Sequence, residues 1–219
     1  MLVTQTWLRI HESQTISVTG SARRNVRSDL VVWRGTFFAE ANTLLEAQRA
    51  LKADAVRVEQ FLTAKGITNA HLSPIGIQSL RSTAKESSES VPRTLGYRLS
   101  QNVEVRSKEV DRIIRLDRES VSLVESGVAF TPLTMEFIYT GAGEAKVEML
   151  AEATKDARNR AEQIATQGNR AIKNLRSAKM GVFQIAPAYS TQTAWDGMND
   201  TTSLDKTITS VVAASFALQ

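Results

Sequence analysis

The chain has 219 residues, of which 42% are hydrophobic and 23% charged, and its formal net charge is +4. This length is enough to bury a hydrophobic core, and the composition is ordinary for a globular protein. The absence of cysteine excludes disulfides, thiol chemistry and thiolate metal sites. Basic residues are scattered along the chain rather than grouped with aromatic ones, so we expect no nucleic-acid partner.

No apolar run reaches the roughly 20 residues that a membrane-spanning helix needs. Residues 1–13 also lack the charged-then-apolar layout of a complete signal peptide. We interpret them as an N-terminal extension ahead of a single domain at 14–219, with a division into sub-units 14–92 and 93–219 as a further option. The extension fits either a native start or the remainder of a chain whose export or anchor segment was removed.

Apolar periodicity and turn residues predict an order of β-β-α-β-β-α-β-α-β-β. The expected strands are 14–20, 29–40, 72–80, 95–106, 133–140, 178–186 and 208–218, and the expected helices are 44–62, 108–126 and 144–168. The stretches 29–80 and 95–140 each run strand, helix, strand, which hints at a duplicated β-α-β unit. We therefore expect an α+β fold, with antiparallel or mixed sheets and three main helices packed on one face.

The helix at 144–168 should anchor this fold. Its apolar residues recur three or four positions apart and are mostly small: Leu150, Ala153, Ala157, Ala161, Ile164 and Ala165. An alanine face lets the backbone of a helix lie close against a sheet. Glu144 suits the positive end of the helix dipole, and Gly168 is expected to end the helix.

Two other elements carry clear patterns. Strand 95–106 alternates apolar and polar residues, which is typical of an antiparallel sheet covered on one side. The helix at 108–126 has its apolar face at Val110, Ile113, Ile114, Val121 and Val124, with Asp117 in the middle. We interpret Asp117 as a carboxylate that reaches water where the helix meets the sheet edge, with a functional role as the alternative.

Metal and cofactor signals are weak. His11 and His71 have no ligand partners at suitable spacing. The acidic run 196–200 lacks the alternating oxygens and terminal glutamate of an EF-hand, so we interpret it as a turn. The basic cluster of Arg23, Arg24 and Arg27 is explained by solvation, or by contact with an anionic membrane surface or acidic partner. We expect no cofactor, no metal and no catalytic residue.

Two polar loops, 81–92 and 188–206, are expected to be exposed. The second contains Trp195, and an indole on such a loop packs either on its own domain or on another subunit. We expect the oligomer contacts to include Trp195, Tyr189 and Arg98.

Three groups of residues together resemble the SIMPL-domain family, bacterial cell-envelope proteins of poorly defined function. They are Ile16, Val18 and Gly20 followed by Asp29; Lys65 to Ile67 followed by Gly96 and Tyr97; and 156–158, 160–162 and 164–165 in the alanine-rich helix. The resemblance covers about residues 14–219. It implies an α+β fold, export with anchoring at the N-terminus in some members, a link to envelope stress, and assembly into higher oligomers. It implies no catalytic residue.

We therefore expect a non-enzymatic envelope or periplasmic protein that acts through self-association and partner binding, with envelope or oxidative stress as its setting. Strand edges and the two polar loops are the expected contact surfaces of a homo-oligomer. The alternative is an enzyme whose carboxylates, Asp117 with Glu104 or Glu136, converge in a cleft. A cytoplasmic location is the alternative to the envelope.

Overall fold

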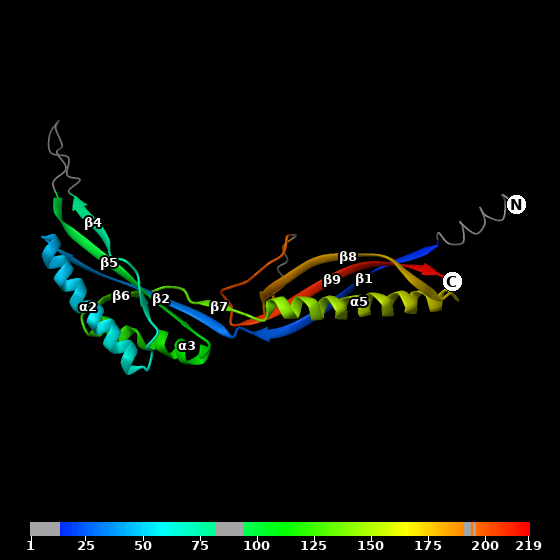
Figure 1. Ribbon diagram of the computed structural model, residues 1–219, viewed down its shortest axis with the longest axis horizontal. Helices are drawn as coiled ribbons and strands as arrows, with labels where there is room; N and C mark the ends of the chain where they lie inside the picture. The colour runs from blue at the N-terminus through cyan, green and yellow to red at the C-terminus, as the bar shows by residue number, and fades with distance from the viewer. Residues whose placement is uncertain (1–13, 82–93, 191–193, 195) are drawn as a thin grey trace, which may run out of the picture. The chain divides into compact units, whose positions relative to one another are not determined.

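A computed structural model of the protein describes residues 14–81, 94–190, 194 and 196–219 (Figure 1). The chain splits into two compact units: unit 1 is Met1–Ser28 with Tyr139–Gln219, and unit 2 is Asp29–Ile138. These boundaries do not coincide with the suggested division into 14–92 and 93–219. The physical reason is strand pairing, since the first strand of the chain pairs with its last strand and so belongs with the C-terminal part.

Unit 1 is a three-stranded antiparallel sheet covered by one long helix (Figure 1). The strands are β1 Thr15–Arg27, β9 Asp205–Leu218 and β8 Ile172–Pro187, in the spatial order β1-β9-β8, and the helix is α5 Ala142–Gln167. The expected helix at 144–168 is thus confirmed. Strand β1 extends well beyond the expected 14–20, because its polar second half pairs with β9 as far as Arg27.

The buried side of α5 is a stripe of five alanines and one methionine spaced four apart: Ala145, Met149, Ala153, Ala157, Ala161 and Ala165. Four residues advance an α-helix by about 400°, so the stripe turns about 40° around the helix at each step. That rotation lets the stripe follow the twist of the strands beneath it. Leu150 is only partly buried, and Ile164 is 56% exposed, so the expectation that Ile164 lies in the packed face is wrong.

Unit 2 is a six-stranded antiparallel sheet built around two long strands. Its elements in chain order are β2 Leu30–Ala41, α2 Leu44–Ala64, β3 His71–Leu72, β4 Gly76–Arg81, β5 Thr94–Ser107, α3 Val110–Glu119, α4 Val121–Glu125, β6 Ala129–Pro132 and β7 Glu136–Ile138. Each half runs long strand, helix, two short strands. The halves exchange their short strands: β3 and β4 pair with β5, whereas β6 and β7 pair with β2.

The core of unit 2 is made of large side chains. Trp33 and Phe37 of β2 are fully buried, as are Leu51 of α2 and Ile113 of α3. Trp33 stacks on Phe130 with 5.8 Å between ring centroids. With helices against antiparallel sheets in both units, the expected α+β fold is confirmed.

The expected helix at 108–126 is broken at Ser120 into α3 and α4. The break shifts the helical register, so Leu123 is buried while Val121 and Val124 are 60% and 53% exposed. Of the expected strand at 133–140, only β7 is formed, and residues 133–135 connect it to β6. In this connection the Leu133 N–H donates to the Arg34 carbonyl.

Candidate binding groove

Strand β1 and helix α5 approach each other unusually closely at Gly20. A Cβ atom at Gly20 would lie 2.2 Å from the carbonyl oxygen of Ala153 and 2.3 Å from the nitrogen of Ala157. Only glycine on the strand and alanine on the helix allow backbones to come this near. The I-x-V-x-G pattern at the start of the chain therefore has a packing reason.

Polar contacts fix α5 over the edge of the sheet. The Arg24 guanidinium donates to Glu148 and to Glu152, with both nitrogen–oxygen distances 2.6 Å, and these bonds raise the pKa of Arg24. The expected basic cluster is therefore divided between two faces of the sheet, because Arg24 points toward the helix while the preceding residue of the strand, Arg23, points to the other face.

Strand β1 is an edge strand, and one of its outward main-chain groups is already bonded. The Ser21 N–H donates to Asp156 Oδ2 at 2.8 Å, and the same oxygen accepts from Arg160 Nε at 2.8 Å. The hydrogen bonds from Ser21 and then from Arg160 lower the pKa of Asp156. Asp156 thus covers the sheet edge at this one point.

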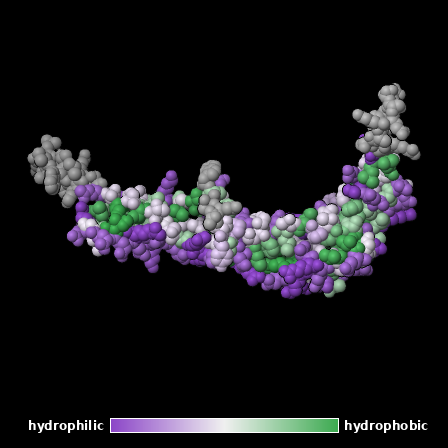
Figure 2. Space-filling model, turned by 180° about the vertical axis from the view of Figure 1, so that it is seen from behind, coloured by the Kyte–Doolittle hydropathy of each residue, from purple (hydrophilic) through white to green (hydrophobic). Residues whose placement is uncertain are grey.

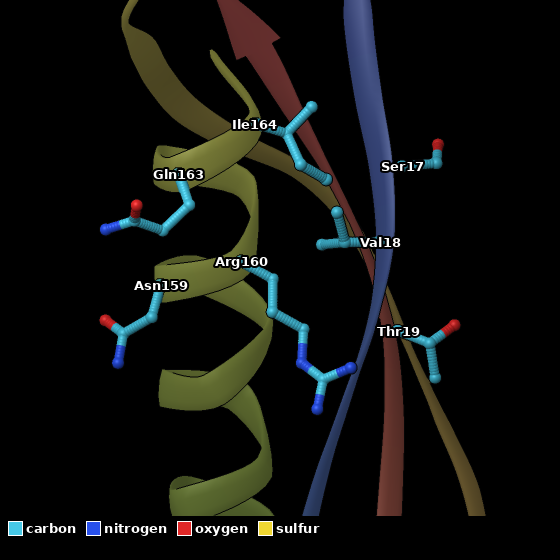
Figure 3. A pocket seen from close by; sticks show the side chains of 7 residues that line it. All are labelled: Ser17, Val18, Thr19, Asn159, Arg160, Gln163 and Ile164. Atoms are coloured by element: carbon cyan, nitrogen blue, oxygen red, sulfur yellow. The ribbon is translucent and has the colours of Figure 1, made fainter. Parts of the chain in front are cut away.

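Beyond Asp156 the edge runs into a groove between β1 and α5 with a volume of about 590 Å³ (Figure 3). The groove is lined by Ser17, Val18, Thr19, Asn159, Arg160, Gln163 and Ile164. In Figure 3 Val18 and Ile164 point toward each other, and Arg160 extends from the helix toward the strand. Ser17 and Thr19 point away from the helix. The site is open and mostly apolar, with one cation, a geometry suited to binding rather than to enclosing a small molecule.

The other edge of this sheet, β8, has a different character. Its helix-side residues Leu175 and Met180 are 48% and 51% exposed, because α5 lies over β1 and β9. The strand has bulges between Ile172 and Leu175, Leu175 and Ser177, and Met180 and Phe183. Figure 2 shows that hydrophobic residues form patches at the surface of both units.

Farther along, the β8 edge is covered by the chain itself. The Ile185 N–H donates to the Met198 carbonyl at 2.7 Å, and the Asp200 N–H donates to the Ile185 carbonyl at 2.8 Å. The Asp200 carboxylate accepts from Thr202, Ser203 and the buried Lys206. Burial acts to raise the pKa of Asp200, but these hydrogen bonds outweigh it and lower the pKa to about 2. The acidic run at 196–200 was expected to be a turn; its Gly197 N–H closes a turn on the Ala194 carbonyl, and the residues after it run beside β8. We call the segment 198–206, which this hydrogen-bonding holds on β8, the latch.

Of the three expected oligomer-contact residues, the structure describes Tyr189 and Arg98. Tyr189 is 90% exposed just after β8 in unit 1. Arg98 lies in unit 2, where it pairs with Glu40 at 2.5 Å and stacks over Phe38 at 4.6 Å. Trp195 lies outside the described residues, as does most of the loop 81–92.

The carboxylates of the enzymatic alternative are engaged with other side chains. Glu104 and Glu136 both accept from Arg34, at 2.6 Å and 2.7 Å, and the bond from Arg34 is the main cause of a lowered pKa of Glu104. Asp117 Oδ1 accepts from the indole of Trp33 at 2.8 Å. Trp33 and Arg34 are adjacent in β2 and point to opposite faces, so Asp117 does not join the glutamates.

In the described ranges, no group of three or more His, Cys, Asp or Glu side chains could hold a metal ion. Within the same part of the chain, no helix is long and apolar enough to span a membrane.

Sequence reasoning did not find the groove. The helical spacing of Ile164 predicted a core residue, and Val18 had the pattern of an ordinary strand residue. The available signal was the absence of charge from Thr15 to Gly20, which is unusual for an exposed strand edge.

These elements define the class: an α+β protein whose open groove lies between an edge strand and an alanine-lined helix. The family model SIMPL, described as a protein of unknown function (DUF541), matches residues 16–216, so the chain belongs to the SIMPL family. No curated protein matches it. A solved structure, an uncharacterized conserved protein from Listeria innocua, is similar at 9% identity and a TM-score of 0.23, covering 87% of this chain and 91% of that one. A likeness that low carries no argument.

Proposed function

We propose that this SIMPL-family chain is a non-enzymatic cell-envelope protein that acts through self-association and partner binding, in a setting of envelope or oxidative stress. The observation that carries the proposal is that, on its helix side, the sheet of unit 1 leaves the β1 groove and the β8 strip of Leu175 and Met180 uncovered. Both are apolar surfaces next to strand edges, which natural proteins usually cover.

Self-association is assigned to the β8 strip, made of Leu175 and Met180. Their partners across the ladder are Phe216 and Val212, both buried in the core of unit 1. Residues paired across an antiparallel ladder share a face, so the strip extends that core past the cover of α5. The bulges and the basic residues of β8 protect its main chain from pairing, so the contact is between side chains.

Light scattering of the purified chain tests self-association. We expect an oligomer at tens of micromolar that Leu175→Ser with Met180→Ser converts to monomer. Val147→Ser is the matched control, because Val147 is 71% exposed on the outer side of α5. A monomeric mass for the unmodified chain contradicts the proposal. Fractionation of cells that express the natural gene tests the envelope location, and recovery in the cytoplasm alone contradicts that part.

A further inference from the structure

The two edges of the unit 1 sheet are protected to different degrees. The exposed part of β8 carries Lys173, Arg176 and Lys179 as well as its bulges, and charges and bulges are the usual protection of an edge strand. From Thr15 to Gly20, β1 has neither charge nor bulge. An unprotected edge of this kind accepts an added strand.

The main-chain groups along this edge face the groove. In an antiparallel ladder every second residue directs its N–H and C=O to the neighbouring strand, and the others direct theirs outward. Ser21 directs its N–H outward, to Asp156. Ser17 and Thr19 share its alternation, and both line the groove. Only an extended main chain supplies donors and acceptors at the matching spacing.

The side chains of the groove specify what that main chain carries. Val18 and the 56% exposed Ile164 form an apolar wall on the helix side. Arg160 donates its Nε–H to Asp156, and its two terminal nitrogens donate to no other group among the described residues. A guanidinium left with free donors beside an apolar wall suits a carboxylate next to an apolar side chain.

We infer that the β1 groove binds an extended segment of a partner protein that places an apolar side chain on Val18 and Ile164 and a carboxylate on Arg160. Side chains two residues apart lie on the same face of a strand, so the recognised pattern is apolar-x-acidic. This is strand addition to a sheet edge, with the main chain supplying affinity and the side chains supplying specificity.

Charge favours a different protein over a second copy of this chain. Strand β1 contains no aspartate or glutamate, and neither does β8. The unit 1 edges of a second copy would therefore bring no carboxylate to Arg160, and β8 would bring three cations toward it. The inference depends on the partner-binding part of the proposed function and is independent of self-association.

The direct test uses fluorescent peptides and the full chain, with binding measured by anisotropy. The probe is Ser-Thr-Ile-Thr-Glu-Thr-Ser-amide with fluorescein on its N-terminus, and a second peptide has Gln in place of Glu. We expect the Glu peptide to bind about tenfold more tightly, as a charge-assisted hydrogen bond provides. A third peptide, with Ile and Glu adjacent, should lose this advantage because its two side chains point to opposite faces.

Variants of the groove then assign the contacts. Arg160→Gln should abolish the preference for Glu over Gln, and Ile164→Ser should weaken both peptides about tenfold. Arg158→Gln is the matched control, since Arg158 lies on the same helix, pairs with Glu162 and is outside the groove lining. N-methylation of every second peptide residue should block binding, whereas N-methylation of the residues between them should not, because only one of the two sets directs its N–H groups to β1. A peptide bound as a helix, or through its side chains alone, would not show this alternation.

The inference is overturned if the unmodified chain shows no saturable binding at millimolar peptide, if the Glu and Gln peptides bind equally, or if Arg158→Gln changes the preference as much as Arg160→Gln. Circular dichroism confirms that each variant is folded. A chain that is monomeric in light scattering but binds the Glu peptide contradicts self-association and leaves this inference standing. An oligomeric chain that does not bind the peptide supports self-association and overturns this inference.

Discussion

The two units both pack helices on a sheet, but they use side chains of different size to do so. Unit 2 places helices on its sheet with large side chains, led by Trp33 and Phe37, and its outer strands are short, from two residues in β3 to six in β4. Unit 1 uses alanine and glycine, and its edge strands β1 and β8 are 13 and 16 residues long. Short edge strands offer little main chain to a partner, whereas long ones offer much. Close packing by small residues therefore goes together, in this chain, with open surfaces for binding.

The largest effect should come from the latch that covers part of the β8 edge. Asp200→Asn leaves the Lys206 ammonium buried without its counter-charge, because the Lys206 side chain is 0% exposed. We expect a loss of about 3–5 kcal/mol in the free energy of unfolding, measured by denaturant titration. Lys206→Met is the matched variant, since it removes the buried charge itself and should cost clearly less. Equal losses for the two variants would show that the latch is not electrostatic.

The contrast in packing is tested by a pair of glycines. Gly20→Ala puts a methyl group against the backbone of α5, whereas Gly35→Ala in unit 2 meets only the side-chain ring of Phe130, 2.1 Å away. A ring can move more easily than a helix backbone. We therefore expect Gly20→Ala to lower the free energy of unfolding by about 3 kcal/mol, and Gly35→Ala to lower it less. Hydrogen exchange resolved by mass spectrometry should show faster exchange in unit 1 alone for Gly20→Ala. Faster exchange in α2 contradicts the separation of the units.

Acid should weaken unit 1 in a defined range. The pKa of Asp200 is about 2 in the folded chain and near 4 when unfolded, so the unfolded state binds more protons as the pH falls. The stabilisation is complete above about pH 4 and is lost as the pH falls toward 2, a change of about 2 kcal/mol. Denaturant titrations at several pH values measure it. Asp200→Asn should show a shallower dependence in this range, and an unchanged slope contradicts the assignment to Asp200.

The smallest effect concerns the hydrogen bond inside unit 2. Asp117→Leu leaves the buried indole N–H of Trp33 without its acceptor and should lower the free energy of unfolding by about 1.5 kcal/mol. Asp117→Asn keeps an acceptor and should cost less. Both are measured by thermal unfolding. If Asp117→Asn causes the larger loss of stability, the carboxylate has a role beyond accepting from Trp33, and the enzymatic alternative should then be tested.

The periodicity of apolar residues alone determined several of the helices and strands of this protein. The spacing of alanine marked the helix at 144–168, and the alternation at 95–106 marked strand β5, because burial of one face imposes a period on any regular element. The SIMPL resemblance was also present in short motifs. The polar half of β1 was missed because its strand conformation depends on β9, nearly the whole chain away, and on Glu148 and Glu152, which pair with Arg24.

Only the tertiary structure decided which regular positions are core and which are surface. Ile164 keeps the spacing of a core residue, yet α5 overhangs the sheet edge, so Ile164 lines the open groove beside Val18 instead of being buried in the core. Asp117 and Trp33 meet across 84 residues, and Asp156 bonds the Ser21 N–H across 135. A sequence pattern reports the period of an element, but the side that is covered depends on neighbours brought from far along the chain.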